Sequence, residues 1–215
     1  IEGEISLDPA TFKPEGPFGE YPGHYSGLGS EPKPVFKVKC ITHRKDPILT
    51  FSSPGMDPGA APELPGNWGT NVHMSFISPA LLLDLFQNAG LDGVTDVASA
   101  GPGGTITFVR TKQPYYGYAK QIASAIWSRM GRASKYVIVV DDDIDVQDVH
   151  KVFLAVGNRA QGAKSVSIYR DTAGADLDPS SHPDVKRKLG GTAHNDRVLI
   201  DATWPFEWQP REEWG

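Results

Sequence analysis

The sequence contains almost no cysteine. Cys40 is the only one among 215 residues, so a disulfide within the chain is impossible and a zinc site built from several cysteines is excluded. A chain without disulfides is typical of a reducing compartment, and we therefore expect a cytoplasmic protein.

Long apolar runs, basic runs and two common catalytic motifs are also missing. No apolar run approaches the roughly 20 residues that a membrane-spanning helix needs, and no secretory signal is recognisable. The net charge is −5 without a basic cluster, which argues against a nucleic-acid partner. The chain has neither a G-x-S-x-G elbow nor a G-x-G-x-x-G loop, so serine hydrolases and dinucleotide-binding folds are not indicated.

Glycine and proline, in contrast, are abundant, with 23 and 18 residues. They frame the most informative segment, Pro14 to Gly23, which carries Glu15 and Glu20 beside Phe18 and Tyr21. Proline fixes φ and glycine permits turns that other residues avoid, so this segment is predicted to hold both carboxyl groups in a shaped loop. An apolar setting favours the protonated form of such groups, which suits proton donation. The alternative is a solvated turn with incidental acids.

The rest of the chain predicts an α/β fold. We expect a hairpin within residues 33–53 and a helix that is capped by Ser78, begins at Pro79 and stops at Gly90. Strands are predicted at residues 94–97, 105–109, 136–140 and 166–169, and helices at 115–130 and 145–158. Strands that alternate with helices indicate a layered fold with a largely parallel sheet.

A run of acids, Asp141, Asp142, Asp143 and Asp145, follows the predicted strand at 136–140. Oxygen ligands at this density could bind a divalent cation. The alternative is the junction between a strand and a helix, at which Asp145 caps the helix and the acids favour its dipole.

Four stretches resemble the UbiD-like carboxy-lyases, a family of reversible decarboxylases that use prenylated FMN. The stretches are EGPFGEYPGHYSG from Glu15, IEGEI at Ile1–Ile5, VIVVDDDID at Val137–Asp145 and IDATWPFEW at Ile200–Trp208. The resemblance implies the end of a flavin-binding split-barrel-type domain at 1–70, a linker helix at 71–90, a three-layer α/β domain at 91–185 and a tail at 186–215. Because the chain begins at Ile1, we expect a carboxyl-terminal part of a longer polypeptide that is inactive alone.

The resemblance also implies a catalytic network of two glutamates and an arginine that lies outside this chain. Glu20 would protonate the carbon that loses CO₂, and Glu15 would hold the arginine. The resemblance places the substrate pocket and the flavin-phosphate contact at further residues, namely Tyr21, His73, Phe76 and Leu177 for the pocket and Arg129 for the phosphate.

The implied reaction is the non-oxidative decarboxylation of an aromatic, heteroaromatic or α,β-unsaturated acid. The implied cofactors are prenylated FMN, Mn²⁺ and K⁺, with metal ligands outside this chain. The implied partners are a flavin prenyltransferase that supplies the cofactor and further copies of the same chain in a homo-oligomer. The alternative function is a noncatalytic α/β module for oligomerisation or ligand binding.

Overall fold

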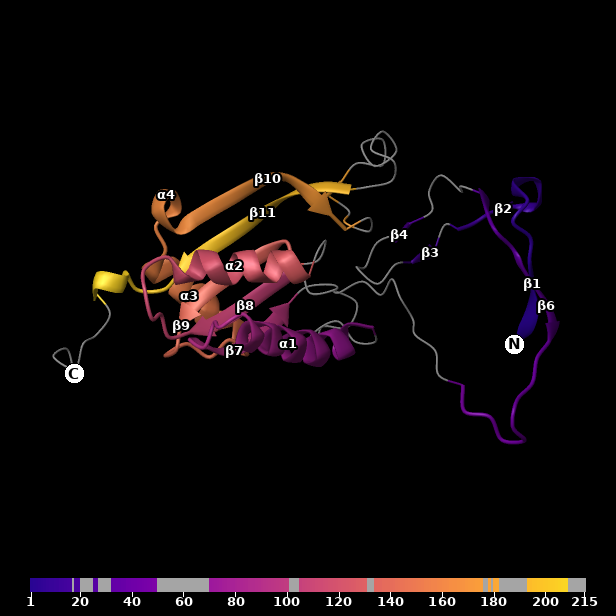
Figure 1. The fold of residues 1–215 in the computed structure, drawn as a ribbon, viewed down its shortest axis with the longest axis horizontal. Coiled ribbons are helices and arrows are strands. Elements are labelled where there is room, and N and C mark those ends of the chain that lie inside the picture. The colour runs from indigo at the N-terminus through magenta and orange to yellow at the C-terminus, as the bar shows by residue number, and fades with distance from the viewer. Residues whose placement is uncertain are drawn as a thin grey trace. The chain divides into compact units, whose positions relative to one another are not determined.

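The computed structural model divides the chain into two compact units, residues 1–63 and 64–215 (Figure 1). We describe each unit by itself. The structure describes residues 1–16, 18–19, 25–26, 32–49, 70–100, 105–130, 134–175, 178, 180–181 and 193–208.

The first unit consists of short antiparallel strand pairs. Strand β1 (Glu2–Ile5) pairs with β6 (Phe36–Cys40), β2 (Lys13–Pro14) with β5 (Pro32–Lys33), and β3 (Phe18–Gly19) with β4 (Tyr25–Ser26). A 3₁₀ turn, η1 (Pro9–Thr11), follows β1. Within the predicted hairpin at 33–53, β6 pairs with β1 and residues 41–49 form no strand, whereas residues 50–53 of its second strand lie outside the described residues.

The β1–β6 pair is amphipathic. Phe36 and Val38 alternate with Lys37 and Lys39 along β6, so apolar and basic side chains lie on opposite faces. Lys39 forms an ion pair with Glu4 of β1. None of the described side chains at 1–16 and 32–49 is buried, so these segments build no hydrophobic core of their own.

The second unit is built on a five-stranded sheet in the order β10-β11-β9-β8-β7. The strands are β7 (Val94–Ala100), β8 (Ile106–Thr111), β9 (Tyr136–Asp141), β10 (Val166–Gly174) and β11 (Ala193–Ala202). The three central strands are parallel, whereas β7 and β10 are antiparallel edges. The sheet is therefore mixed rather than largely parallel. Strand β11 occupies a central place although it lies within the predicted tail at 186–215.

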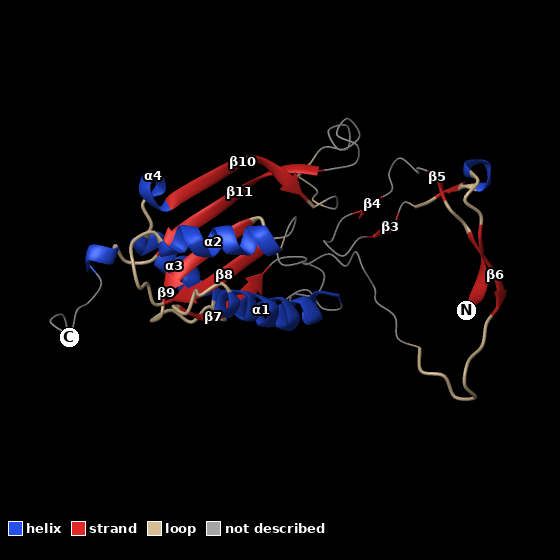
Figure 2. Cartoon of the chain, in the orientation of Figure 1, coloured by secondary structure: helices blue, strands red, loops and turns tan. Residues whose placement is uncertain are grey.

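The helices are α1 (Thr70–Asn88), α2 (Tyr118–Arg129), α3 (Val149–Arg159) and the short α4 (Gly162–Ser165), with a final 3₁₀ turn, η3 (Phe206–Trp208) (Figure 2). The predicted cap at Ser78 is wrong, since α1 begins at Thr70 and contains Pro79. Gly90 follows the helix with φ +68°, a conformation that glycine adopts without strain and that commonly ends helices. Among the described helices, none is long and apolar enough to cross a membrane.

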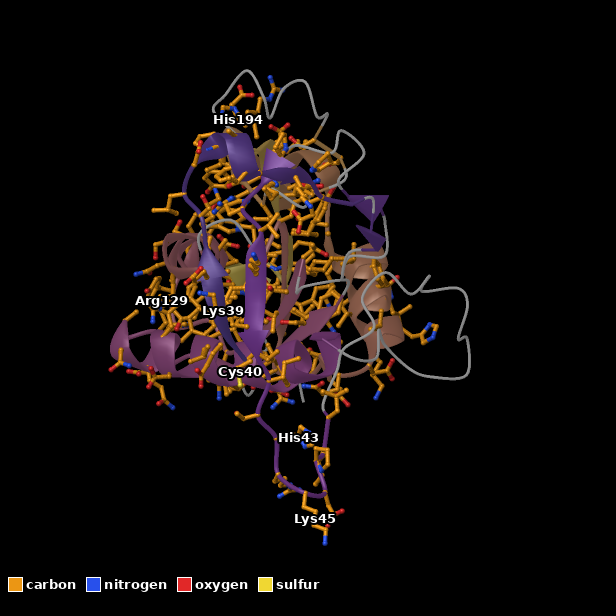
Figure 3. All side chains as sticks on the ribbon, turned by 90° about the vertical axis from the view of Figure 1, so that its right-hand side faces the viewer. Lys39, Cys40, His43, Lys45, Arg129 and His194 are labelled. Atoms are coloured by element: carbon orange, nitrogen blue, oxygen red, sulfur yellow. The ribbon has the colours of Figure 1, made fainter. Side chains whose placement is uncertain are left out.

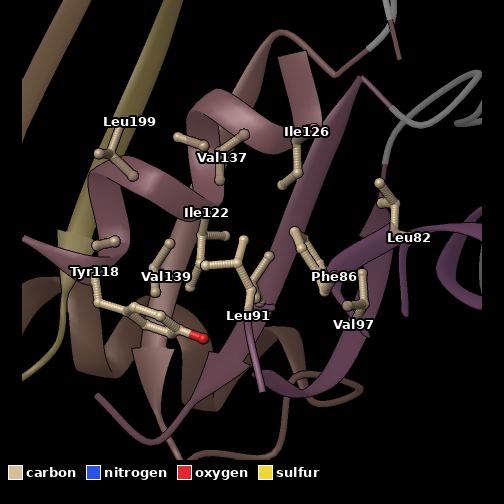
Figure 4. Packing of buried hydrophobic residues seen from close by; sticks show 13 residues of the cluster. Leu82, Phe86, Leu91, Val97, Tyr118, Ile122, Ile126, Val137, Val139 and Leu199 are labelled. Carbon is tan, nitrogen blue, oxygen red and sulfur yellow. The ribbon is translucent and has the colours of Figure 1, made fainter. Parts of the chain in front are cut away.

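Helices on both faces of the sheet make three layers. Along β9, Val137 and Val139 contribute to the core beneath α1 and α2, while Ile138 and Val140 contribute to the core beneath α3. This alternation follows from the two-residue period of a strand. All four side chains are at most 3% exposed, as expected for an apolar run in a strand that is covered on both faces. The larger core, shown in Figure 4, includes Leu82, Phe86, Leu91, Val97, Tyr118, Ile122, Ile126 and Leu199.

Candidate functional site

Glu15 lies directly after the β2–β5 strand pair. Its neighbour Gly16 has φ +78°, which a residue with a Cβ adopts only with strain. The Glu15 side chain is exposed. A strand pair on one side and a left-handed glycine on the other therefore define the backbone that presents this carboxylate.

Glu20 and Tyr21 lie outside the described residues, in the stretch 20–24. The two strands that flank this stretch are described. In the β3–β4 pair, Phe18 is opposite Ser26 and Gly19 is opposite Tyr25. The ends of the segment that carries the predicted proton donor are therefore held together by antiparallel pairing.

The remaining predicted site residues belong to the second unit. His73 and Phe76 lie in the first half of α1, but their side chains are outside the described part, as is Leu177. Arg129 is the last residue of α2 and is exposed (Figure 3). Among the predicted site residues, the structure therefore gives the local side-chain settings of Glu15 and Arg129.

The acids after β9 form a network with Arg159. Asp141 is only 7% exposed and accepts hydrogen bonds from Nη1 of Arg159 at 3.1 Å and from the backbone amide of Trp204 at 2.7 Å. Asp143 accepts two hydrogen bonds from the same guanidinium, at 2.8 and 2.6 Å. The guanidinium carbon lies 4.9 Å from the centre of the Trp204 ring. One arginine thus joins β9, α3 and the segment after β11.

The two aspartates of this network differ in acidity. Burial raises the pKa of Asp141, and the hydrogen bond from the Trp204 amide and the charge of Arg159 oppose that rise. Hydrogen bonding from Arg159 lowers the pKa of the more exposed Asp143. Arg159 therefore favours the ionised form of both groups.

The other acids of this region shape the backbone. Asp145 accepts a hydrogen bond from the Gln147 amide. Asp148 caps α3 by accepting from the amides of His150 and Lys151. The cap is thus Asp148 rather than the predicted Asp145. No group of three His, Cys, Asp or Glu side chains suited to a metal ion occurs among the described residues, so the junction between strand and helix explains this acidic run better than a cation site.

A second polar cluster lies at the opposite, amino-terminal end of β9. Nζ of Lys135 contacts Oδ2 of Asp178 at 3.1 Å and Oγ of Ser180 at 2.7 Å. Nδ2 of Asn195 donates to Oδ2 of Asp178 at 3.0 Å. No sequence motif points to this cluster or to Arg159, because Lys135 lies 43 residues from Asp178 and Arg159 lies 18 residues from Asp141.

Two family models match the chain. The Rift-related domain of 3-octaprenyl-4-hydroxybenzoate carboxy-lyase matches residues 1–57, and the C-terminal domain of the same carboxy-lyase matches residues 71–202. The chain belongs to the UbiD carboxy-lyase family. The resemblance noted in the sequence is therefore confirmed, and the two matched ranges correspond to the two kinds of architecture in the structure.

Relatives and solved structures agree with this UbiD assignment. An uncharacterized protein of Archaeoglobus fulgidus is 32% identical over 216 residues, which cover 99% of this chain and 40% of that protein. The closed form of the vanillic acid decarboxylase of Sedimentibacter hydroxybenzoicus is 30% identical, with a TM-score of 0.73 over 97% of this chain and 40% of that chain.

The UbiD-class enzyme HmfF from Pelotomaculum thermopropionicum, solved with FMN, is 28% identical with a TM-score of 0.72, over 97% of this chain and 42% of that one. An evolved dimeric form of HmfF, solved with prFMN, is 25% identical with a TM-score of 0.66, over 97% and 40%. The predicted α/β fold class is confirmed. The chain spans about two fifths of the length of these UbiD relatives.

Proposed function

We propose that this chain forms part of an enzyme that decarboxylates an aromatic, heteroaromatic or α,β-unsaturated acid reversibly and without oxidation, with prenylated FMN as cofactor. The observation that carries the proposal is the similarity, over 97% of the chain, to a vanillic acid decarboxylase. The FMN and prFMN in the HmfF structures support the choice of cofactor.

In this proposal Glu20 delivers the proton and Glu15 orients the arginine that binds the substrate carboxylate. Loss of CO₂ leaves an electron pair on carbon, and prenylated FMN supplies the electron sink for it. The exposed carboxylate of Glu15, on a backbone shaped by Gly16, is suited to a bidentate pairing with an arginine. Glu20, five positions later, must be protonated when the carbon needs its proton.

Arg129 is the candidate contact for the flavin phosphate, because its exposed guanidinium can pair with phosphate oxygens. The described residues contain no cluster of candidate metal ligands, so we assign no step to Mn²⁺ or K⁺. A flavin prenyltransferase would supply the cofactor, and we propose that the enzyme is a homo-oligomer.

The first test compares two lengths of polypeptide. We expect the 215-residue chain alone to bind little flavin and to show no turnover, because the arginine and most flavin contacts lie elsewhere. A polypeptide of the relatives' full length, co-expressed with a flavin prenyltransferase, should carry a modified flavin and release CO₂ from an acid such as vanillic acid. Full-length protein that takes up the cofactor and decarboxylates no acid of a broad panel would contradict the proposal and favour a noncatalytic module.

The second test separates the glutamates in the full-length enzyme. Glu20→Gln keeps the shape but cannot donate a proton, so turnover should fall by about 10²-fold or more while flavin stays bound. Glu15→Gln should also impair turnover through a misplaced arginine. The matched control is Glu2→Gln, since Glu2 is an exposed glutamate of β1 in the same unit. Near-normal turnover by Glu20→Gln, with solvent hydrogen still entering the product, would rule out its role as donor.

The third test concerns the substrate. Tyr21, His73, Phe76 and Leu177 would together line a flat, mostly apolar slot with one or two polar contacts, which suits an aromatic acid. His73→Ala should then weaken turnover of hydroxylated or nitrogen-containing aromatic acids and spare an unsubstituted cinnamate-type acid. Equal losses of turnover across the panel would make His73 a structural residue, and a preference for aliphatic acids would contradict the aromatic slot.

A further inference from the structure

Asp178 lies in the connection between β10 and β11 and is held by an unusual number of donors. Its Oδ2 accepts from Lys135 at 3.1 Å and from Asn195 at 3.0 Å, and its Oδ1 accepts from the amide and the hydroxyl of Ser180 at 2.9 and 2.7 Å. The Asp178 and Lys135 side chains are only 12% and 19% exposed. Burial of an ion pair at this depth is costly unless hydrogen bonds satisfy it, and here they do.

The backbone around Asp178 is fixed by the same cluster. The Asp178 amide donates to the carbonyl of Ala175 at 2.9 Å, and the Ser181 amide donates to the carbonyl of Asp178 at 3.2 Å. Burial acts to raise the pKa of Asp178, but hydrogen bonds from Asn195, Ser180 and Lys135 outweigh it and hold the pKa well below the usual range. The carboxylate is therefore ionised throughout the neutral range and keeps its partners.

The partners of Asp178 are anchored in the centre of the sheet. Lys135 immediately precedes β9, its amide donates to the carbonyl of Thr105 at 2.8 Å, and its carbonyl accepts from the amide of Val198 in β11 at 3.0 Å. Asn195 lies within β11, and its carbonyl accepts from the Thr172 hydroxyl of β10 at 2.9 Å. Two of the three side chains that hold Asp178 thus come from positions whose backbone is fixed by strand pairing.

We propose that Asp178 is a positioning residue: through Lys135 and Asn195 it fixes the backbone at Asp178, Ser180 and Ser181 against the sheet, next in the chain to Leu177. The anchor itself involves only contacts that the structure describes. The link to substrate choice rests on the proposed function, which puts Leu177 in the pocket wall. A wall residue displaced by about 1 Å is enough to change turnover strongly. The anchor would therefore control which acids fit, although Asp178 itself touches no substrate.

Hydrogen exchange on the 215-residue chain tests the anchor without cofactor or turnover. The informative variant is Lys135→Met, because it leaves every residue of the 174–181 segment unchanged and keeps the length of the side chain. We expect protection of the Ser180 and Ser181 amides to fall about tenfold, with the amides of β9 unchanged. Asp178→Ala should give the same local pattern. The matched control is Asp148→Ala, which removes a similar aspartate cap and should affect only the start of α3.

Unchanged protection at Ser180 and Ser181 in Lys135→Met would overturn the anchor. A loss spread evenly over the sheet would overturn it as well, because Lys135 would then act on global stability alone.

A kinetic test on the full-length, flavin-loaded enzyme addresses the link to substrate choice. Lys135→Met should raise KM about tenfold for the bulkier acids of a panel and leave kcat for the smallest acid and the flavin content nearly unchanged. A uniform change across the panel would refute the link to the pocket. Wild-type protein that decarboxylates nothing, with the exchange result intact, would instead refute the proposed function and leave the anchor standing.

Discussion

Arg159 offers the sharpest test of how the second unit is held together. Its guanidinium hydrogen-bonds Asp141 at 3.1 Å and Asp143 at 2.8 and 2.6 Å, and it lies over the ring of Trp204. We predict that Arg159→Met, which keeps most of the apolar stem, destabilises this unit by about 4 kcal/mol.

The magnitude follows from the exposure of each partner. The Arg159 and Asp141 side chains are 10% and 11% exposed, and removing one member of a buried ion pair costs about 3–5 kcal/mol. Asp141 retains the amide hydrogen bond of Trp204, which favours the lower end. The Asp143 side chain is 56% exposed, so that pair adds only about 0–1 kcal/mol, and the contact with the Trp204 ring adds about 0.5–1 kcal/mol.

Urea unfolding, monitored by hydrogen exchange of the β9 amides, measures this loss of stability in the second unit alone. The matched control is Asp143→Asn, which removes the exposed partner and should cost less than about 1 kcal/mol. Combining Arg159→Met with Asp141→Asn removes the unpaired buried charge, so the double variant should be more stable than Arg159→Met alone by about 2 kcal/mol.

The dependence of stability on pH provides an independent check, because the direction of the change can be predicted. The pKa of Asp141 is already raised by burial, and it should rise further once the charge of Arg159 is gone. A carboxyl group whose folded pKa exceeds its unfolded value binds more protons when folded, so lowering the pH through the folded pKa favours the native state. The loss of stability in Arg159→Met should therefore shrink as the pH falls through the folded pKa of Asp141. The prediction would be refuted if Arg159→Met lost less than about 1 kcal/mol of stability. It would also be refuted if the double variant with Asp141→Asn were no more stable than Arg159→Met.

Three further predictions concern stability. Gly157→Ala adds a methyl group to α3 with no atom within 4 Å, so thermal unfolding should show that stability rises by about 0.5–1 kcal/mol. In Gly93→Ala the new Cβ would lie 2.4 Å from the carbonyl oxygen of Lys112, so stability should fall by about 1–3 kcal/mol. Asp148→Ala removes the cap of α3 and should lower the midpoint of urea unfolding; an unchanged midpoint would mean that the His150 and Lys151 amides find other acceptors. Because the pKa of Asp178 is lowered on folding, its stabilisation should be complete above about pH 4 and decline below it, so the acid unfolding curve of Asp178→Asn should be flatter there than that of the wild type.

Patterns that depend on neighbouring residues were predictable from the sequence alone. The predicted strand at 136–140 forms β9, and its residues 137–140 are buried. The glutamate segment was recognisable from its proline and glycine frame and its resemblance to UbiD-like enzymes. Each of these inferences uses only local periodicity or a contiguous motif.

Pairings between distant segments were decided by the tertiary structure. Strand β6 pairs with β1 at the start of the chain, and β11 enters the centre of the sheet from a range that resembled a tail. Asp141 meets Arg159 because α3 packs on the sheet beside β9, and Lys135 meets Asp178 because the β10–β11 connection reaches the amino-terminal end of β9. Strand pairing and buried ion pairs depend on which segments the fold brings together, and local sequence carries little information about partners tens of residues away.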